Sequence, residues 1–247
     1  MTNNDSSSNN DKSIVIIADG PYIIKGNVPL VRKIQVVSEY GEPLVWKTEA
    51  TLPTGPGEYE LCRCGQSRNK PFCDGAHGEV GFDGSEHAAS SVADSLRMAF
   101  RGGTRLIVKK DLSLCMNSGF CRMQKITLEQ LIAESKHTQA RSLAMAMVER
   151  CPSGSLTYQI EPGEADIEPD LPQQIAVTTE ITSDGPIDGP LWVSGGIPVE
   201  RADGRPFETR NRVTLCNCGL SNNKPLCDGA HRFEAQRLAQ QRKLAGK

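Results

Sequence analysis

One pattern of cysteine and histidine occurs twice in this chain and limits what the chain can fold into. In each copy three cysteines and one histidine follow the spacing C-x-C-x8-C-x3-H, and the second copy lies 154 positions after the first. Thiolate and imidazole groups are ligands for transition metals, so four of them in one short loop indicate a metal site. The candidate ligands are Cys62, Cys64, Cys73 and His77 in the first copy and Cys216, Cys218, Cys227 and His231 in the second.

The spacing also bears on the choice of metal. Structural zinc sites usually pair their cysteines as C-x2-4-C, whereas the leading pair of each copy here is separated by a single residue. Three thiolates and one imidazole suit a [2Fe-2S] cluster, because thiolates favour iron-sulfur cores and imidazole can replace thiolate on one iron. The ligand chemistry therefore favours iron-sulfur, with a zinc-stabilised interaction module as the alternative.

Both loops resemble those of the CDGSH iron-sulfur domain proteins, whose motif is C-x-C-x2-(S/T)-x3-P-x-C-D-G-(S/A/T)-H. The non-ligand positions are matched by Ser67, Pro71 and Asp74-Gly75 in the first copy and by Ser221, Pro225 and Asp228-Gly229 in the second. The resemblance implies one [2Fe-2S] cluster per motif, held by the three cysteines and the histidine of each copy. It covers a small part of the chain. Because units of this family normally pair across a twofold axis, it also implies a monomer whose two copies pair internally.

Composition limits the other functions. With 38% hydrophobic and 5% aromatic residues, several small cores are expected rather than one large core. A net charge of −2 provides no field for nucleic acid or an anionic membrane, so neither partner is expected. Nine cysteines, an odd number grouped with histidines, favour metal ligation in a reducing compartment over disulfides. Met1 to Asp11 has no basic region and Ile14 to Ile17 is too short for a signal peptide or membrane span, so a cytoplasmic protein is expected.

Short strands separated by turns are expected upstream of both motifs. Strands are predicted over Ile14–Ala18, Tyr22–Ile24 and Val31–Val37, with turns at 19–21 and 40–43. The second half repeats this order at Asp188-Gly189-Pro190, Leu191-Trp192-Val193, Gly196-Ile197-Pro198-Val199 and Asp203-Gly204-Arg205-Pro206. Each repeat is therefore a set of short strands followed by a cluster loop. The first copy carries about fifteen extra residues, which include Pro53–Gly57.

The segment between the repeats has a helical period instead. The pattern predicts a helix over Ser90–Phe100, a strand over Arg105–Lys109, a helix opened by a capping box at Thr127–Gln130, and a helix over Gln139–Arg150. The methionines of the last helix are expected to fill the core. His87 and His137 have polar neighbours and are expected at the surface.

This middle segment holds the remaining cysteines, Cys115, Cys121 and Cys151. Their arrangement, C-x2-S-x2-C with a distant Cys-Pro, is that of a bacterial ferredoxin run with serine at its second position. The segment from about Arg105 to Tyr158 is similar to the divergent mono-cluster ferredoxin domains found beside CDGSH motifs. Three thiolates could hold a [3Fe-4S] cluster, or a [4Fe-4S] cluster with one iron on a non-cysteine group. The alternative is that all three are buried structural cysteines.

We therefore predict an α+β protein, in which two small, mainly-β CDGSH-type units flank a ferredoxin-like α+β domain. The expected parts are a disordered polar tail at 1–12, the first unit at 13–83, the ferredoxin-like domain at 84–165, the second unit at 166–233 and a basic, helical tail at 234–247. The expected function is one-electron transfer, redox sensing or cluster transfer between redox or cluster-acceptor proteins. A small reductase is the enzymatic alternative. Catalysis is not expected, because the sequence contains no recognisable P-loop, dinucleotide-binding glycine motif or Ser-His-Asp pattern.

Overall fold

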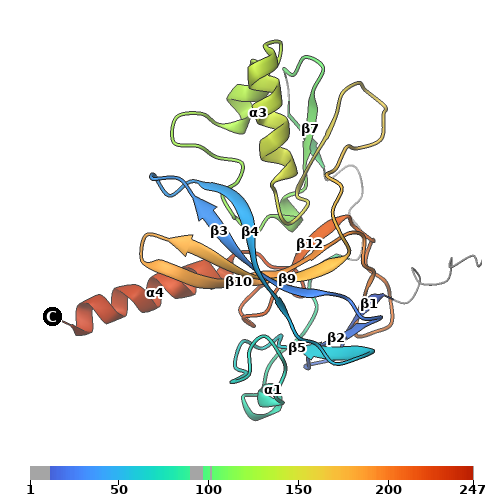
Figure 1. The fold of residues 1–247 in the computed structure, drawn as a ribbon, viewed down its shortest axis with the longest axis vertical. Coiled ribbons are helices and arrows are strands. Elements are labelled where there is room, and N and C mark those ends of the chain that lie inside the picture. Colours follow the sequence, from blue (N-terminus) through green and yellow to red (C-terminus); the bar gives the residue numbers. More distant parts are fainter. Residues whose placement is uncertain (1–11, 90–96, 101, 247) are drawn as a thin grey trace, which may run out of the picture.

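The structure is a computed structural model, and it describes residues 12–89, 97–100 and 102–246. The described chain is α+β, with several small sheets and few helices. Figure 1 shows the middle segment above a central sheet, residues 22–25 and 58–79 of the first unit below it, and the C-terminal helix projecting to one side. The predicted N-terminal tail, except for residue 12, lies outside the described residues.

The two repeats supply most of the strands. The first repeat forms β1 (Ser13–Ile16), β2 (Tyr22–Lys25), β3 (Leu30–Val37), β4 (Pro43–Leu52), β5 (Glu58–Leu61) and the short helix α1 (Ala76–Glu79). The second forms β9 (Gln174–Thr182), β10 (Gly185–Ser194), β11 (Val199–Glu200), β12 (Arg212–Leu215) and the long helix α4 (Ala230–Ala245). The strands predicted in the first repeat are thus confirmed, and the basic tail is helical as predicted.

The two repeats exchange strands with each other. β1 pairs in parallel with β11, and β3 pairs in parallel with β9. Both pairings begin with an equivalent backbone hydrogen bond. Ile14 N donates to Pro198 O at 2.9 Å, and Ile175 N donates to Pro29 O at 2.9 Å. The resulting sheets have the orders β11-β1-β2-β5 and β12-β10-β9-β3-β4. The two units are therefore related by a pseudo-twofold axis within one chain.

Alternation along the strands explains the shared core between the repeats. Side chains on one face of β1 and β2 are fully buried, and they meet inward-facing side chains of β10 and β12. Successive side chains of a strand point to opposite faces, so each hairpin supplies one apolar row. The central members of this core are Ile14, Ile16, Tyr22, Leu61, Leu191, Val193 and Leu215.

The middle segment has a core of its own. β6 (Met98–Ala99), β7 (Ile107–Lys110) and β8 (Leu156–Gln159) form an antiparallel sheet. The helices α2 (Leu128–Ala133) and α3 (Thr138–Glu149) pack on it, and a 3-10 turn, η2 (Leu112–Leu114), follows β7. The predicted capping box is present, since Thr127 Oγ1 accepts from Gln130 N and Gln130 Oε1 accepts from Thr127 N. Met147 is buried in this core, and both His87 and His137 are exposed, as predicted.

One predicted helix is wrong where the structure describes it. Met98 and Ala99, at the end of the helix expected over Ser90–Phe100, form β6 and pair with Lys110 and Lys109 of β7. Residues 90–96 of that prediction lie outside the described residues. Three apolar residues at helical spacing were the only signal, and pairing to a neighbouring strand outweighs so weak a pattern.

In the part of the chain that the structure describes, no helix has the length and apolar character needed to cross a membrane.

Candidate metal centres

Each cysteine loop is held by hydrogen bonds from its own polar residues. In the first copy, Ser67 Oγ donates to Phe72 O at 2.7 Å and accepts from Asn69 N at 3.0 Å. In the second, Ser221 Oγ donates to Leu226 O at 2.7 Å and accepts from Asn223 N at 3.0 Å. Such short-range bonds satisfy backbone groups that a loop leaves unpaired. The serine of the motif therefore shapes the loop.

The Asp-Gly step of each motif closes the same loop. Asp74 accepts from Arg68 N at 2.8 Å and from Ala76 N at 3.1 Å, and these bonds lower the pKa of its carboxyl group. Asp228 makes the equivalent pair of bonds at 2.9 and 3.0 Å. The following glycines have φ of 86° and 89°, a conformation that other residues adopt at a cost. The step turns the chain so that the histidine faces the third cysteine.

The four candidate ligands of each loop form two close pairs. In the first loop, Cys62 Sγ lies 3.8 Å from Cys64 Sγ, and Cys73 Sγ lies 3.4 Å from His77 Nδ1. In the second, the corresponding distances are 3.6 and 3.5 Å, between Cys216 and Cys218 and between Cys227 and His231. Both copies therefore present two cysteine sulfurs on one side and a sulfur with a ring nitrogen on the other.

This pairing fits two metal atoms better than one. Two sulfurs that share a tetrahedral metal at about 2.3 Å lie about 3.8 Å apart, close to the Cys–Cys distances seen here. Among the described residues, no three Cys, His, Asp or Glu side chains are arranged to hold a single ion. A structural zinc site would need all four donors around one point. The donor set suits a binuclear, thiolate-rich group.

Burial and neighbouring donors set the protonation of the free thiols. Burial raises the pKa of Cys73 and of Cys227. The Cys218 thiol, as a hydrogen-bond donor, lowers the pKa of Cys216 to about 6, with help from backbone amides of the loop. Metal ligands must be deprotonated. The hydrogen bond from Cys218 therefore favours the thiolate of Cys216, whereas burial opposes loss of the proton from Cys73 and Cys227.

The two loops meet back to back at their glycines. A Cβ placed on Gly65 would lie 2.5 Å from the Cys218 carbonyl oxygen, and one on Gly219 would lie 2.6 Å from the Cys64 carbonyl oxygen. Real Cβ atoms do not come so close to backbone atoms. The two centres are therefore in direct contact through the backbone of their second cysteines.

The two histidines have different surroundings. His231 is buried, and its Nε2 lies 3.1 Å from Glu180 Oε2. The same oxygen lies 2.6 Å from Nε of Arg232. A carboxylate on the outer ring nitrogen orients a ligating histidine and fixes its tautomer. His77 is half-buried, and among the described residues its Nε2 has no such partner.

The three middle cysteines line a single cavity. Cys115 and Cys121 come from the loop between η2 and α2, and Cys151 from the loop after α3. They border a volume of about 160 Å³ together with Ser118 and Lys110. Burial raises the pKa of Cys121, and the nearby Cys151 adds to the effect. Ser118, at the position of the missing ferredoxin cysteine, lies in the same wall. The sequence prediction that these residues act together is compatible with this placement.

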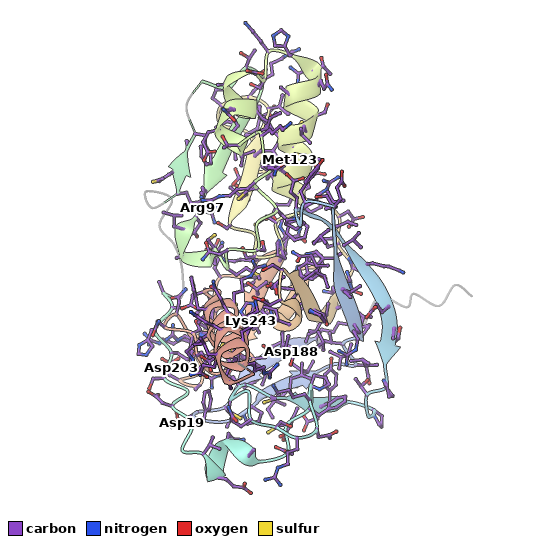
Figure 2. All side chains as sticks on the ribbon, turned by 90° about the vertical axis from the view of Figure 1, so that its left-hand side faces the viewer. Asp19, Arg97, Met123, Asp188, Asp203 and Lys243 are labelled. Atoms are coloured by element: carbon purple, nitrogen blue, oxygen red, sulfur yellow. The ribbon has the colours of Figure 1, made fainter. Side chains whose placement is uncertain are left out.

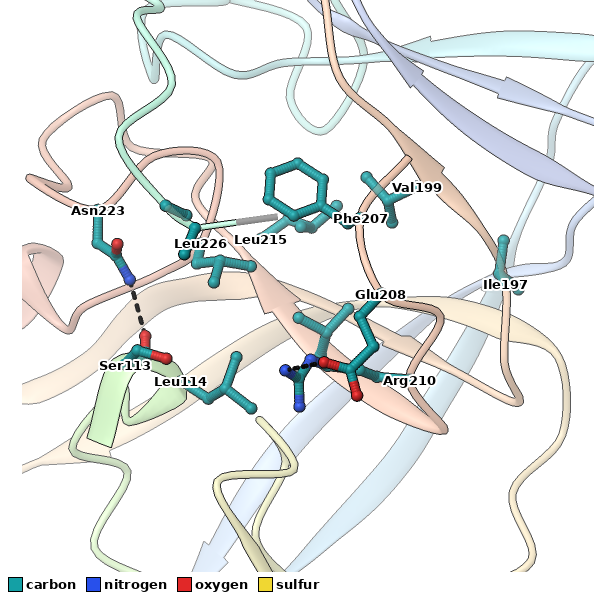
Figure 3. Close-up of a pocket in the computed structure, with 13 residues that line it drawn as sticks. Ser113, Leu114, Ile197, Val199, Phe207, Glu208, Arg210, Leu215, Asn223 and Leu226 are labelled. Carbon is teal, nitrogen blue, oxygen red and sulfur yellow. Dashed lines mark hydrogen bonds and ion pairs between the residues drawn. The ribbon is translucent and has the colours of Figure 1, made fainter. Parts of the chain in front are cut away.

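The middle cavity lies against the second centre. The Arg232 guanidinium donates to Ser118 O at 3.4 Å, and Asn117 Nδ2 donates to Asp228 O at 3.4 Å. Asn223 Nδ2 donates to Ser113 O at 2.7 Å, at the rim of a separate apolar cavity of about 30 Å³ (Figure 3). That cavity has room for water but not for a substrate. The middle segment is therefore joined to the second metal-binding loop.

Sequence reasoning missed Glu180 and the part of Arg232 in orienting His231. Glu180 lies on β9, a strand that the sequence prediction did not include, and it is separated from His231 by 51 positions. The sequence contains no signal for this role, because β9 carries threonine and glutamate at buried positions. Only the structure shows that this glutamate is buried and therefore needs a partner.

Comparison with known protein families identifies the same two loops. The family model described as "Iron-binding zinc finger CDGSH type" matches residues 19–78 and residues 188–232. Each matched region contains one of the two motifs, so the predicted recognition of two CDGSH-type motifs is confirmed. No curated protein matches the chain.

Proposed function

We propose that this chain is an iron-sulfur protein that holds one [2Fe-2S] cluster in each CDGSH-type loop. Its ligands are the cysteines and histidine of each copy, and its role is to pass single electrons, or clusters, between partner proteins. A bound [2Fe-2S] cluster supplies a one-electron redox step. The chain itself fixes the donors, excludes water from the buried sulfurs and orients the histidines.

The observation that carries this proposal is the division of each donor set into a Cys–Cys pair and a Cys–His pair. Two pairs suit two irons, and the matched family description names iron as the bound metal. This arrangement argues against the zinc-stabilised module. The nine cysteines are all free in the structure, which agrees with the reducing cytoplasm as the proposed location.

Metal and sulfide analysis of aerobically purified protein tests the proposal. We expect about four iron atoms from two such clusters, no stoichiometric zinc, and visible absorption that bleaches on reduction. Cys73→Ser should remove about two iron atoms per chain, and Cys227→Ser should remove about two others. Zinc at one atom per loop without sulfide would overturn the proposal. Flavin content and turnover with a reduced nicotinamide test the reductase alternative.

We further propose a third cluster, [3Fe-4S] or [4Fe-4S], in a ferredoxin-like middle domain. The observation in its favour is that Cys115, Cys121 and Cys151 line one cavity of about 160 Å³. Lys110 and Arg122 border the same cavity and would offset the charge of a thiolate-bound group. Iron above about four atoms per chain, lost selectively in Cys121→Ala, is the expected result. Iron that stays at about four in both proteins would assign structural roles to these cysteines.

A further inference from the structure

The pseudo-twofold axis creates two equivalent hollows, one beside the first cysteine of each loop. The hollow beside Cys62 has a volume of about 230 Å³. Its polar walls are Arg32 and Lys70 from the first unit and Asp188 and Asn217 from the second. Strand register and motif spacing give their symmetry mates beside Cys216, which are Arg201, Lys224, Asp19 and Arg63. Asp19 and Asp188 are labelled in Figure 2.

The hollow beside Cys216 is filled by the chain itself, through the inserted segment (residues 84–88). Asp19 Oδ1 accepts from Gly84 N at 2.8 Å, and the Arg63 guanidinium donates to Gly84 O. A Cβ on Gly84 would lie 3.0 Å from Asp19 Cα, so the segment fits closely at this end. The insertion thus gives hydrogen-bond partners to the Asp19 carboxylate and to the Arg63 guanidinium.

The far end of the inserted segment is held by the other two mates. Arg201 Nη1 donates to Ala88 O at 2.8 Å, and Lys224 O accepts from Ala88 N at 3.0 Å. The side chain of Glu86, only 7% exposed, brings its carboxylate within 3.7 Å of Arg201 Nε. All four mates thus bind one irregular segment that carries one acidic side chain.

The hollow beside Cys62 has equivalent groups at three of the four positions and no such segment among the described residues. The guanidinium of Arg32 makes no hydrogen bond or ion pair within the described chain, and Asp188 meets only Lys70, at 3.7 Å. Asn217 occupies the position that Arg63 occupies in the other hollow, and its side chain is shorter than that of arginine. The asymmetry begins after the motifs: past α1 the chain turns back to insert residues 84–88, whereas past the second motif it continues as α4.

We propose that the hollow beside Cys62 is a docking site for an irregular, acidic segment of a partner protein. The segment binds as residues 84–88 bind in the mate: its carbonyls accept from Arg32, its amides donate to Lys70 O and Asp188, and its carboxylate pairs with Arg32. Charge-assisted bonds from arginine to carbonyl and carboxylate groups are the strong class of hydrogen bond. A docked partner would lie against Cys62, so the first centre faces the partner and the second is sealed. The site itself does not depend on which metal the loops hold.

The test uses a fluorescently labelled peptide with the sequence of residues 82–89, added to the full-length purified protein. Anisotropy should show saturable binding at one site per chain. Arg32→Ala should weaken binding at least tenfold, whereas Asn217→Arg, which supplies the arginine that binds Gly84 O in the mate, should not weaken it. The matched variant Arg201→Ala should not weaken it. Circular dichroism and iron content report whether each variant keeps the native fold.

The peptide offers a second test that needs no protein variant. Its Glu86→Gln form should bind the wild-type protein at least tenfold more weakly, because the pair with Arg32 is lost. Absence of saturable binding would overturn the proposal. So would binding that depends on Arg201 and not on Arg32, because the peptide would then only displace the inserted segment. Arg32-dependent self-association in light scattering would assign the hollow to a second copy of the chain instead.

Discussion

Two glycines set the closest approach between the metal-binding loops. Gly65 and Gly219 each have a positive φ, and each faces a backbone carbonyl of the other loop. At such positions a side chain meets two separate penalties, the left-handed backbone and the contact itself. Gly204 shares the positive φ, but a Cβ there would meet no atom within 4 Å. A substitution at Gly204 therefore measures the cost of the left-handed backbone alone.

Gly65→Ala should therefore destabilise the protein more than Gly204→Ala does. The left-handed conformation alone costs about 1–2 kcal/mol, and the forced contact with Cys218 adds about 1–3 kcal/mol. Urea unfolding of both variants measures the difference. Equal losses of unfolding free energy would mean that the loops separate easily, contrary to their contact in the structure.

Glu180 is expected to stabilise metal at the second centre alone. Glu180→Gln keeps the shape but removes the charge that orients His231 and pairs with Arg232. Loss of such an outer partner typically weakens metal affinity about 10–100-fold. Iron release to a chelator, followed in a Cys73→Ser background that retains only the second centre, should accelerate by a comparable factor. Asp184→Asn is the control, because Asp184 lies on the same hairpin but pairs with Lys243 instead of a histidine. It should leave the rate of iron release unchanged.

The roles of motif residues were accessible from sequence because their partners are local. Ser67 bonds within five positions and Asp74 within six, so spacing alone relates them. Glu180 and Arg63 act on groups that only the tertiary fold brings near. The sequence around each of these two charged residues does not indicate that its side chain is buried. Local chemistry could thus be predicted, whereas the partner of His231 could not.

Among the elements, the strands β1, β2 and β3 and the helices α2 and α3 followed from their patterns. β4 was not predicted because most of its residues are exposed, which leaves no apolar alternation to detect. β9 was missed although it is central, since it mixes threonine and glutamate into its buried face. The exchange of β3 and β9 depends on contacts between repeats, which no local pattern contains.

A single substitution at Thr127 tests whether the capping box stabilises α2. Its hydroxyl oxygen accepts from Gln130 N, and this bond satisfies one of the free amides at the start of α2. Thr127→Ala should lower the stability of the middle domain by about 1 kcal/mol. Thermal unfolding followed by circular dichroism measures it, with Thr127→Ser, which keeps the oxygen, as the control. An alanine variant as stable as wild type would show that packing of Leu128 and Leu131 alone holds the helix.

At the scale of the whole molecule, the paired repeats predict a monomer. The parallel pairings β1–β11 and β3–β9 already join one unit to the other, so no second chain is needed to complete either sheet. Light scattering should give the mass of one chain, 26.8 kDa, over a wide range of concentration. A dimer that persists on dilution would mean that the repeats exchange strands between chains instead.

The strand exchange also has a consequence for how the protein is made. Ile14 pairs with Val199, and Leu30 with Ile175, so the first repeat leaves the ribosome before its partner strands exist. At about 5–20 residues per second, the wait for them is on the order of ten seconds or more. During that time β1 and β3 have open edges, which are templates for pairing with other nascent chains. Slow translation of the middle segment would lengthen the time for which these edges are open. Chaperone binding to the first repeat would reduce their pairing with other chains.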